Sequence, residues 1–474
     1  MAESSDTTEK WRYVVALGKF VVHMIYSGMT KAISVLVPAM VFQFQMDYTL
    51  VGFLVPMQLG VVYIACPLSN YLATKFGHRC LSSIGGFLSG VSMMGAFFSQ
   101  SALSLGCSFF FTGLFSSPLY QSSTVILREH FGEKYGMAIT FTQMGGQIGG
   151  IIFPYTAVLC LEAYGMRGAL LCLSGIFFYQ TAIGATFRSP RSTAVKKKKR
   201  HNPGEDDIEG STLLQGQEDE TYHQKNKLRT DVESLNTDEG TSDESRIRKD
   251  AESQKSNPIG NLIAEVLTSI FPLGLFRKEL VFTFIFIPCQ IILEGCFAIW
   301  ITFSASYGMS VGLHENEAVY LPMIGSLGGI ISRLVLLRIL YKHPHLAPHA
   351  FSVNTVVSSM ALMAHPISSS LVHFLICSFF VGFGIYGSTS SLDAYLAIKV
   401  KKENFSLAMA TTFMTSGVIL LISATLAGNV FERIRSFKTI FIAAGVVLLI
   451  NFGVFSVFLF VDTFLKRRSS TENK

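Results

Sequence analysis

The feature that most constrains this chain is a series of long apolar stretches, each about as long as a helix that crosses a lipid bilayer. A bilayer core about 30 Å thick needs roughly 20 apolar residues per spanning helix. The sequence has twelve such stretches in two sets of six. They lie near residues 13-38, 50-73, 80-99, 104-127, 136-160, 168-187, 280-304, 317-339, 351-369, 371-397, 406-428 and 438-462. We therefore predict an all-α integral membrane protein with twelve transmembrane helices in two six-helix bundles.

The composition agrees with this fold class everywhere except in one segment between the two sets. Hydrophobic residues make up 50% of the chain and charged residues 15%. Residues 188-260, in contrast, contain "KKKKR", "GEDDIEG" and "TDEGTSDESRIRK" and almost no aromatic side chains. Such a segment cannot bury enough apolar surface to fold. We expect an N-terminal bundle at 1-187, a disordered cytoplasmic linker at 188-260, a C-terminal bundle at 261-462 and a cytoplasmic tail at 463-474.

Basic residues indicate which helix ends face the cytoplasm. The run from Lys196 to Arg200 follows the sixth apolar stretch, where topogenic charge explains it better than a specific lipid site does. Most short loops with lysine or arginine, and the tail "KRR" at 466-468, fall on the same side, with "FERIRSFK" at 431-438 as an exception. The polar N-terminus has no signal-peptide pattern, so we expect the first helix to direct insertion. We predict a multi-pass protein of the plasma membrane with both termini in the cytoplasm.

The sequence shows none of the familiar patterns of an enzyme or a metal site. The eight cysteines lie in or at the ends of apolar stretches, which favours free thiols over disulfides. No zinc-ligand spacing, phosphate-binding loop or nucleophile elbow stands out. We therefore expect no enzymatic activity, no bound metal or cofactor, and no nucleic-acid partner.

The stretch "HFGEKYGMAITFTQMGGQIGG" at 130-150 starts as a charged turn and continues as an apolar helix with an unusual composition. One face of this helix carries the small residues Ala138, Thr142, Gly145, Gly146 and Gly149. Small residues let a neighbouring helix approach closely and slide. Gln143 and Gln147 lie one turn apart beside them, and an amide in hydrocarbon is costly unless it is bonded across helices or faces water. The pattern predicts a helix that packs tightly and moves, although static packing with both amides satisfied by neighbours explains the glutamines equally well.

Two six-helix halves joined by a long linker are typical of transporters in which one half rocks against the other around a site near the bilayer midplane. Several blocks then resemble one family in their order along the chain. They are "ATKFGHRCLSSIGGFLSG" at 73-90, the stretch at 130-150, "AYGMRGALLCLSG" at 163-175, "SYGMSVGLHENEAVYLPMIGSLGGIISR" at 306-333 and "KENFSLAMATTFMTSG" at 402-417. This series is similar to the monocarboxylate transporters of the major facilitator superfamily. The resemblance implies a small organic anion as substrate and, often, a single-span accessory membrane protein.

The chain also departs from the family pattern at several positions. The proton-coupled members carry an aspartate four residues before an arginine in the eighth helix, and this chain has Gly329 before Arg333. An arginine and an asparagine of the fifth helix are replaced by Tyr135 and Ile139. Lys31 in "TKAIS" and Arg333 do match the family's basic positions. The resemblance therefore implies an atypical member, and the family's lactate chemistry does not carry over intact.

Charged residues inside the apolar stretches are candidates for function. Lys31 and Arg333 lie well inside their helices, where a charge costs at least about 2.5 to 3.5 kcal/mol unless a partner or an anionic substrate offsets it. Glu294 lies near the middle of the seventh stretch, where low dielectric favours the protonated acid, so it can replace the missing aspartate. A permanent ion pair of Glu294 with Arg333 or Lys31 is the alternative. Asp393 lies near a cytoplasmic helix end, and pairing with the nearby lysines accounts for it.

These observations predict a secondary transporter of a small monocarboxylate or related organic anion that works by alternating access, with possible proton symport. The predicted substrate-binding residues are Lys31, Arg333, Gln143, Gln147 and Ser27. Glu294 is the predicted proton-coupling residue. The alternative is a facilitator or transporter-like sensor for a neutral or zwitterionic solute such as an amino acid. The expected partners are the substrate anion, protons, the lipid bilayer and a single-span accessory protein.

Overall fold

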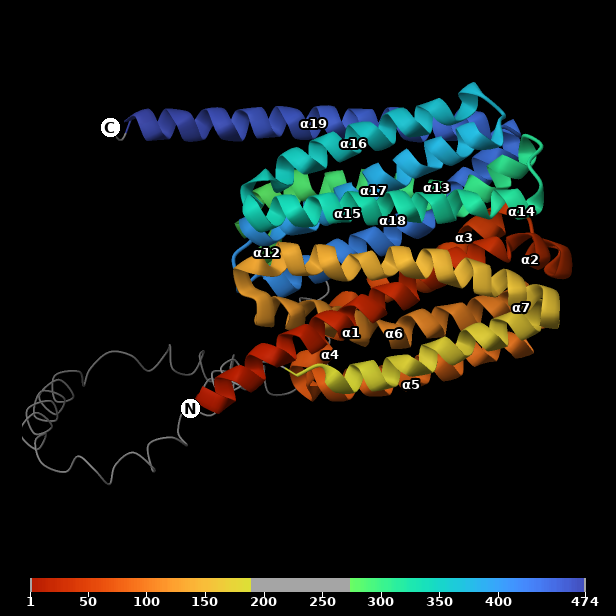
Figure 1. Cartoon of the computed structure of the whole chain (residues 1–474), viewed down its shortest axis with the longest axis horizontal. Coiled ribbons are helices and arrows are strands. Elements are labelled where there is room, and N and C mark those ends of the chain that lie inside the picture. Colours follow the sequence, from red (N-terminus) through yellow and green to blue (C-terminus); the bar gives the residue numbers. More distant parts are fainter. Residues whose placement is uncertain (1, 189–272, 473–474) are drawn as a thin grey trace, which may run out of the picture. The chain divides into compact units, whose positions relative to one another are not determined.

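The computed structural model describes residues 2–188 and 273–472, which belong to one compact unit (Figure 1). No strand occurs in these residues, so the all-α prediction is confirmed for them. The predicted linker at 188-260 lies outside the described residues except for its first position, and so does the beginning of the predicted C-terminal bundle.

The N-terminal half contains two helix pairs that are bent at proline. Its helices are α1 (Ala2–Val35), α2 (Val37–Phe44), α3 (Tyr48–Ile64), α4 (Cys66–Phe76), α5 (His78–Met94), the short η1 (Gly95–Phe98), α6 (Ala102–Phe131), η2 (Gly132–Lys134) and α7 (Tyr135–Thr186). The chain bends by 54° between α1 and α2 and by 41° between α3 and α4. Pro38 and Pro67 lie just after the two breaks, where a proline lacks the N–H that would continue the helix.

Helix α7 turns back on itself at Gly165. This glycine has a φ of 68° and a ψ of 180°, a conformation that is essentially restricted to glycine. The helix before Gly165 and the helix after it are therefore two separate segments joined by a tight turn. The sequence predicted the two segments as the stretches 136-160 and 168-187.

The C-terminal half also consists of helices. Its elements are α12 (Leu273–Lys278), the π-helical η3 (Phe282–Phe286), α13 (Ile287–Ser310), α14 (Glu315–Ala318), α15 (Tyr320–Lys342), η4 (Pro344–Leu346), α16 (Ala347–Ala364), η5 (His365–Ile367), α17 (Leu371–Lys399), α18 (Phe405–Ile434) and α19 (Phe437–Glu472). Figure 1 shows α15, α16, α17 and α19 above the red to yellow helices of the N-terminal half, whereas α18 runs down among those helices. Each half is thus formed by a continuous part of the chain.

The number of membrane-spanning segments is consistent with twelve. Seven helical runs in the described residues are long and apolar enough to span a membrane, and the two bent pairs raise the number to nine. One run, Ala102–Thr186, covers 85 residues and is interrupted by η2 and by the turn at Gly165. Dividing this run at its two interruptions and adding the 18-residue α16 gives twelve segments within residues 2–188 and 273–472.

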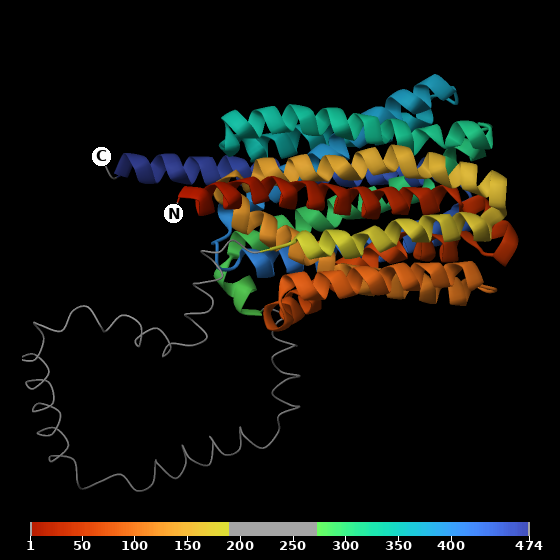
Figure 2. The same cartoon turned by 60° about the horizontal axis from the view of Figure 1, so that its bottom comes forward.

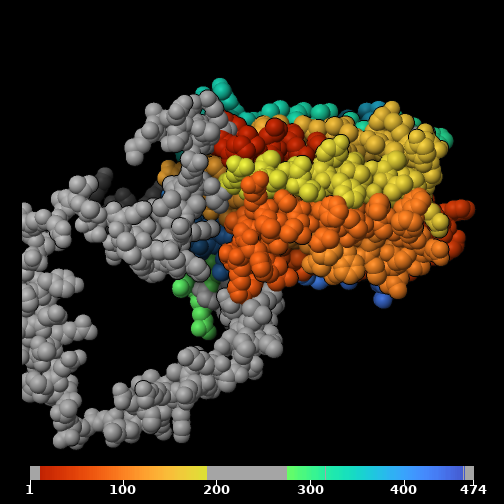
Figure 3. All heavy atoms as spheres, turned by 90° about the horizontal axis from the view of Figure 1, so that it is seen from below, coloured from red at the N-terminus to blue at the C-terminus, as the bar shows by residue number. Residues whose placement is uncertain are grey.

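The outer surface of the N-terminal half is apolar. Figure 3 shows a face covered by the orange and yellow elements, which are α5, α6 and the last part of α7. Large apolar side chains on these elements are exposed, among them Phe87, Leu103, Phe111 and Tyr179. An apolar surface of this extent is expected where helices face lipid.

The described chain ends lie on the same side of the bundle. Figure 1 shows the N-terminal end of α1 and the C-terminal end of α19 on the same side of the bundle, where α12 also lies. This arrangement agrees with the prediction that both termini face one compartment.

The two halves touch at both ends of the bundle. Near the C-terminal ends of α6 and α17, Arg128 Nη2 donates to the carbonyl oxygen of Ala397 at 3.1 Å. At the opposite end, the backbone N–H of Thr49 donates to Glu432 Oε1 at 3.0 Å. Hydrogen bonds therefore join the two halves near both ends of the bundle.

Candidate functional site

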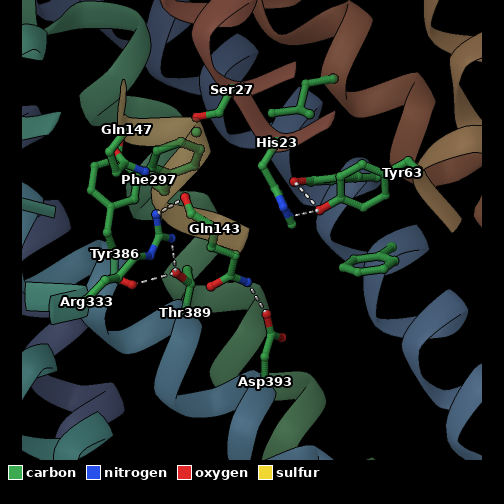
Figure 4. A pocket seen from close by; sticks show the side chains of 14 residues that line it. His23, Ser27, Tyr63, Gln143, Gln147, Phe297, Arg333, Tyr386, Thr389 and Asp393 are labelled. Carbon is green, nitrogen blue, oxygen red and sulfur yellow. Dashed lines mark hydrogen bonds between the residues drawn. The ribbon is translucent and has the colours of Figure 1, made fainter. Parts of the chain in front are cut away.

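A small cavity lies at the centre of the bundle, where helices of both halves meet (Figure 4). Its volume is about 80 Å³. Its polar lining consists of His23, Ser27, Gln143, Gln147, Arg333, Thr389 and Asp393. Its aromatic lining consists of Tyr63, Tyr120, Phe297, Tyr386 and Phe413. A cavity of this size holds a few water-sized groups, so it suits a small solute with a few polar atoms.

The glycine face of α7 packs directly against α1, and Figures 1 and 2 show the two helices side by side. A Cβ atom on Gly145 would overlap the carbonyl oxygen of Phe20. A Cβ atom on Gly146 would lie 2.9 Å from the Cβ of Ser27. The predicted close approach at the small residues is therefore confirmed. It places Ser27 of α1 and the two glutamines of α7 at one wall of the cavity.

The two glutamines of α7 bond to different halves of the molecule, Gln143 to the C-terminal half and Gln147 to α1. Gln143 Nε2 donates to Asp393 Oδ2 at 2.7 Å, and Gln147 Oε1 accepts from Lys31 Nζ at 2.9 Å. Both glutamines also line the cavity. The structure thus shows tight packing with bonded amides beside the cavity, and the expected movement of the helix stays a prediction.

Lys31 lies next to the cavity without lining it. Its side chain is fully buried, and Nζ donates to Gln147 Oε1 and, at 2.8 Å, to Ser326 Oγ of α15. Gly150 makes room for it, because a Cβ atom there would overlap the ammonium group. The ammonium thus joins α1 and α7 of the N-terminal half to α15 of the C-terminal half.

Arg333 reaches across from α15 into the cavity. Nη1 donates to the carbonyl oxygen of Gln143 at 2.6 Å, Nε to Ser390 Oγ at 2.8 Å and Nη2 to Thr389 Oγ1 at 3.5 Å. A guanidinium group has five N–H donors. The bonds found within the described residues use one donor on each nitrogen, so one N–H on each terminal nitrogen is left for a ligand. No carboxylate of the described residues lies within 4.0 Å of these nitrogens.

Tyr386 of α17 fills the space beside Gly329. A Cβ atom on Gly329 would lie 2.5 Å from Cδ2 of Tyr386, so an aspartate at position 329 would collide with this ring. The ring also faces both buried cations, with Lys31 Nζ 4.8 Å and Arg333 Cζ 5.3 Å from its centroid. The Tyr386 hydroxyl is buried and has no hydrogen-bond partner among the described residues. The Tyr386 ring therefore occupies the space that a side chain at position 329 would need.

Glu294 lies on α13 and is buried, but it does not meet either cation. Oε1 accepts from Nε2 of Gln290, one turn earlier on the same helix, at 2.9 Å. Gln290 Nε2 also donates to Ser416 Oγ of α18 at 3.1 Å. The ion pair with Arg333 or Lys31 that we considered from the sequence is not formed. Whether Glu294 carries a proton stays a prediction.

Asp393 was interpreted wrongly from the sequence. We expected a helix-end acid paired with the nearby lysines, because its stretch was taken to end at 397. The structure shows Asp393 buried, lining the cavity and bonded to Gln143. Lys399 pairs instead with Asp462 of α19, with 3.4 Å between Nζ and Oδ2. Helix α17 continues to Lys399, so Asp393 lies nearly two turns inside its end.

A second polar cluster borders the cavity on the N-terminal side. His23 and Tyr120 are joined by a contact of 3.4 Å between Nε2 and the hydroxyl oxygen (Figure 4 shows His23 beside Tyr63). Lys19 is fully buried, and Nζ donates to Tyr120 O at 3.1 Å and to Thr124 Oγ1 at 2.8 Å. No group of three or more His, Cys, Asp or Glu side chains in residues 2–188 and 273–472 could hold a metal ion.

Several residues of the site were missed by the sequence analysis, and one signal could have revealed them. The segment "GSTSSLDAY" at 387-395 is a run of hydroxyl side chains followed by an acid inside an otherwise apolar helix. Such a run is costly in hydrocarbon unless it faces a partner or a water-filled cavity. Thr389, Ser390 and Asp393 of this run all take part in the central network.

Comparison with known proteins agrees with this architecture. The model of the Major Facilitator Superfamily matches residues 20–396. The chain belongs to the major facilitator superfamily. It is 23% identical over 468 residues to Monocarboxylate transporter 2 of Mesocricetus auratus, with 97% of this chain and 85% of that protein covered. It is 22% identical to Monocarboxylate transporter 1 of Homo sapiens, covering 95% of this chain and 84% of that protein.

Within the superfamily, the chain is a divergent member of the monocarboxylate transporter family, as the sequence blocks predicted. A crystal structure of the nucleoside transporter NupG is similar in fold, with a TM-score of 0.60 at 11% identity over 94% of this chain and 99% of that chain. The all-α membrane fold and the secondary-transporter class are thereby confirmed. The superfamily consists of transporters, which supports the expectation that the chain is not an enzyme.

Proposed function

We propose that the chain transports a small monocarboxylate or related organic anion by alternating access, with symport of a proton. The observation that carries the proposal is the guanidinium of Arg333, which borders the central cavity with one N–H on each terminal nitrogen not used by the protein. The N–H groups of a planar guanidinium can bond both oxygens of a carboxylate. A bound carboxylate would also offset the cost of a buried charge that has no carboxylate partner within reach.

The other predicted residues support the same site in different ways. Gln143, Gln147 and Ser27 line the cavity, so their polar atoms can contact the remainder of the substrate. Lys31 donates a hydrogen bond to Gln147, and its ammonium adds positive charge near the Tyr386 ring. The hydrogen bonds between the halves at both ends fit an intermediate in which the substrate is enclosed.

The proposal includes the cellular setting. We place the protein in the plasma membrane with both termini in the cytoplasm, because the basic short loops lie on the side of the termini. A single-span accessory protein is part of the proposal through the family resemblance alone. A membrane-impermeant label on an engineered cysteine in the linker should react only in permeabilised cells, and reaction in intact cells would invert the orientation.

Uptake into proteoliposomes tests the proposed substrate class. Labelled lactate, labelled pyruvate and a panel of labelled amino acids would be offered with and without an inward proton gradient. We expect uptake of a monocarboxylate that rises when the gradient is imposed. Uptake of amino acids with no uptake of any monocarboxylate would contradict the proposal.

One observation favours a second candidate function, the transport of a zwitterion such as an amino acid. Asp393 and Arg333 line the same cavity, so a carboxylate and a cation are both available to a solute that carries both charges. The amino-acid arm of the uptake experiment tests this candidate directly.

A further inference from the structure

A continuous chain of hydrogen bonds runs from Arg333 to Asp393. Arg333 Nε donates to Ser390 Oγ at 2.8 Å, and Ser390 Oγ donates to Gln143 Oε1. Gln143 Nε2 then donates to Asp393 Oδ2 at 2.7 Å. Every donor points the same way, from the cation toward the acid, and Figure 4 shows Gln143 between Arg333 and Asp393.

The direction of the chain depends on the proton content of Asp393. The ionised carboxylate has only acceptors, so it requires the N–H₂ side of the Gln143 amide. A protonated Asp393 keeps an acceptor oxygen and gains an O–H donor, which the amide can accept by turning its oxygen toward Asp393. The N–H₂ group of Gln143 then faces Ser390, whose oxygen has two lone pairs and can accept from both Gln143 and Arg333.

The two states differ in how strongly Arg333 attracts a second anion. With Asp393 ionised, the chain of hydrogen bonds connects Arg333 to a negative charge. Each hydrogen bond in such a chain polarises and strengthens the next. With Asp393 protonated, that negative charge is gone and the positive potential of Arg333 is available to a substrate carboxylate. A proton on Asp393 therefore favours binding of an anion at Arg333, and by linkage the anion favours the proton.

The chain also crosses the contact between the two halves. Gln143 belongs to α7 of the N-terminal half, whereas Ser390, Asp393 and Arg333 belong to α17 and α15 of the C-terminal half. Opening the halves must break the bonds of Gln143 to both partners. The amide of Gln143 is thus linked to the proton on Asp393, to the anion site at Arg333 and to the contact between the halves.

We propose that Asp393 is the proton-binding residue of this transporter and that Gln143 relays its protonation to Arg333. The inference rests on the proposed function and assigns to Asp393 the role that the sequence gave to Glu294. Glu294 bonds to its own helix and has no such path to Arg333. The ionisable groups near Asp393 are Lys19 and His23 of α1, Tyr63 of α3, Tyr120 of α6, Tyr135 of α7, Glu294 of α13 and Arg333 of α15.

The test is the pH dependence of KM for exchange of labelled lactate, measured in proteoliposomes of the full chain with equal pH on both sides. In the wild type, KM should fall about tenfold between mildly alkaline and mildly acidic pH. Asp393→Asn resembles the protonated acid, so its KM should be low and independent of pH. Asp393→Glu keeps an acid and should keep the pH dependence, which covers the case in which Asp393→Asn does not fold.

Three further variants separate Asp393 from its neighbours. Glu294→Gln and His23→Gln should retain the pH dependence of KM, whereas Gln143→Met should lose it although Asp393 is present. The inference is overturned if Asp393→Asn keeps the wild-type pH dependence, or if Glu294→Gln or His23→Gln loses it. A wild type that exchanges lactate with a KM independent of pH overturns the inference and leaves the proposed anion substrate standing. A wild type that exchanges amino acids and no monocarboxylate overturns both.

Discussion

The two buried cations of the centre, Lys31 and Arg333, have the same charge and very different surroundings. The ammonium of Lys31 is fully buried and donates to the side chains of Gln147 and Ser326. The guanidinium of Arg333 borders the cavity and keeps N–H groups that the protein does not use. The ring of Tyr386 faces both cations, so the two positive charges lie near the same side chain and repel each other.

The difference teaches that burial of a charge does not by itself indicate a ligand site. Lys31 bonds neutral oxygens from both halves with two of its three N–H donors, which suits a bridge that must break when the halves separate. Arg333 is only partly satisfied and faces space that a small solute can fill. We therefore propose that Lys31 helps to hold the two halves together and that Arg333 binds the substrate.

The largest effect should come from Arg333→Ala, which removes the group that meets the substrate carboxylate. We expect loss of anion uptake in proteoliposomes, because an anion in the cavity would then lack its cation. Arg338→Ala on the exposed face of the same helix is the matched control and should transport normally. Normal uptake by Arg333→Ala would remove the arginine from the site.

Lys31→Met should have an intermediate effect that appears in the maximal rate and not in KM. Methionine keeps most of the length of the side chain and removes two hydrogen bonds between helices of the site. We expect the maximal rate of lactate exchange to change by about tenfold, because the balance between conformations shifts by roughly 1.4 kcal/mol. A large rise of KM with an unchanged maximal rate would instead make Lys31 a binding residue like Arg333.

The sequence predicted the buried cations and the glycine face better than it predicted their hydrogen-bond partners. Lys31, Arg333 and the glycine face of α7 could be found because charges and glycines are conspicuous in an apolar helix. The partners could not be found in the same way, because Ser326 and Ser390 come from helices far away in sequence. Asp393 was misjudged because its partner Gln143 lies on α7, far away in sequence, and because the end of its own helix was placed two residues too early.

The smallest effect should come from Tyr386→Phe. This change keeps the ring that faces both cations and removes a buried hydroxyl that has no partner among the described residues. If the hydroxyl bonds the substrate, KM should rise about fivefold, which corresponds to a hydrogen bond of roughly 1 kcal/mol. The melting temperature of the purified protein should not fall. An unchanged KM would show that the hydroxyl does not touch the substrate.

Direct binding of labelled lactate to purified protein tests the central claim, which is that the fork of Arg333 holds the carboxylate. The wild type would be compared with Arg333→Lys, which keeps the charge and removes the paired N–H groups, and with Lys31→Met. The account predicts that Kd rises about ten- to a hundredfold in Arg333→Lys, because a charged hydrogen bond contributes about 1.5 to 3 kcal/mol, and changes only a few-fold in Lys31→Met. A Kd that is unchanged in Arg333→Lys and strongly raised in Lys31→Met would contradict it.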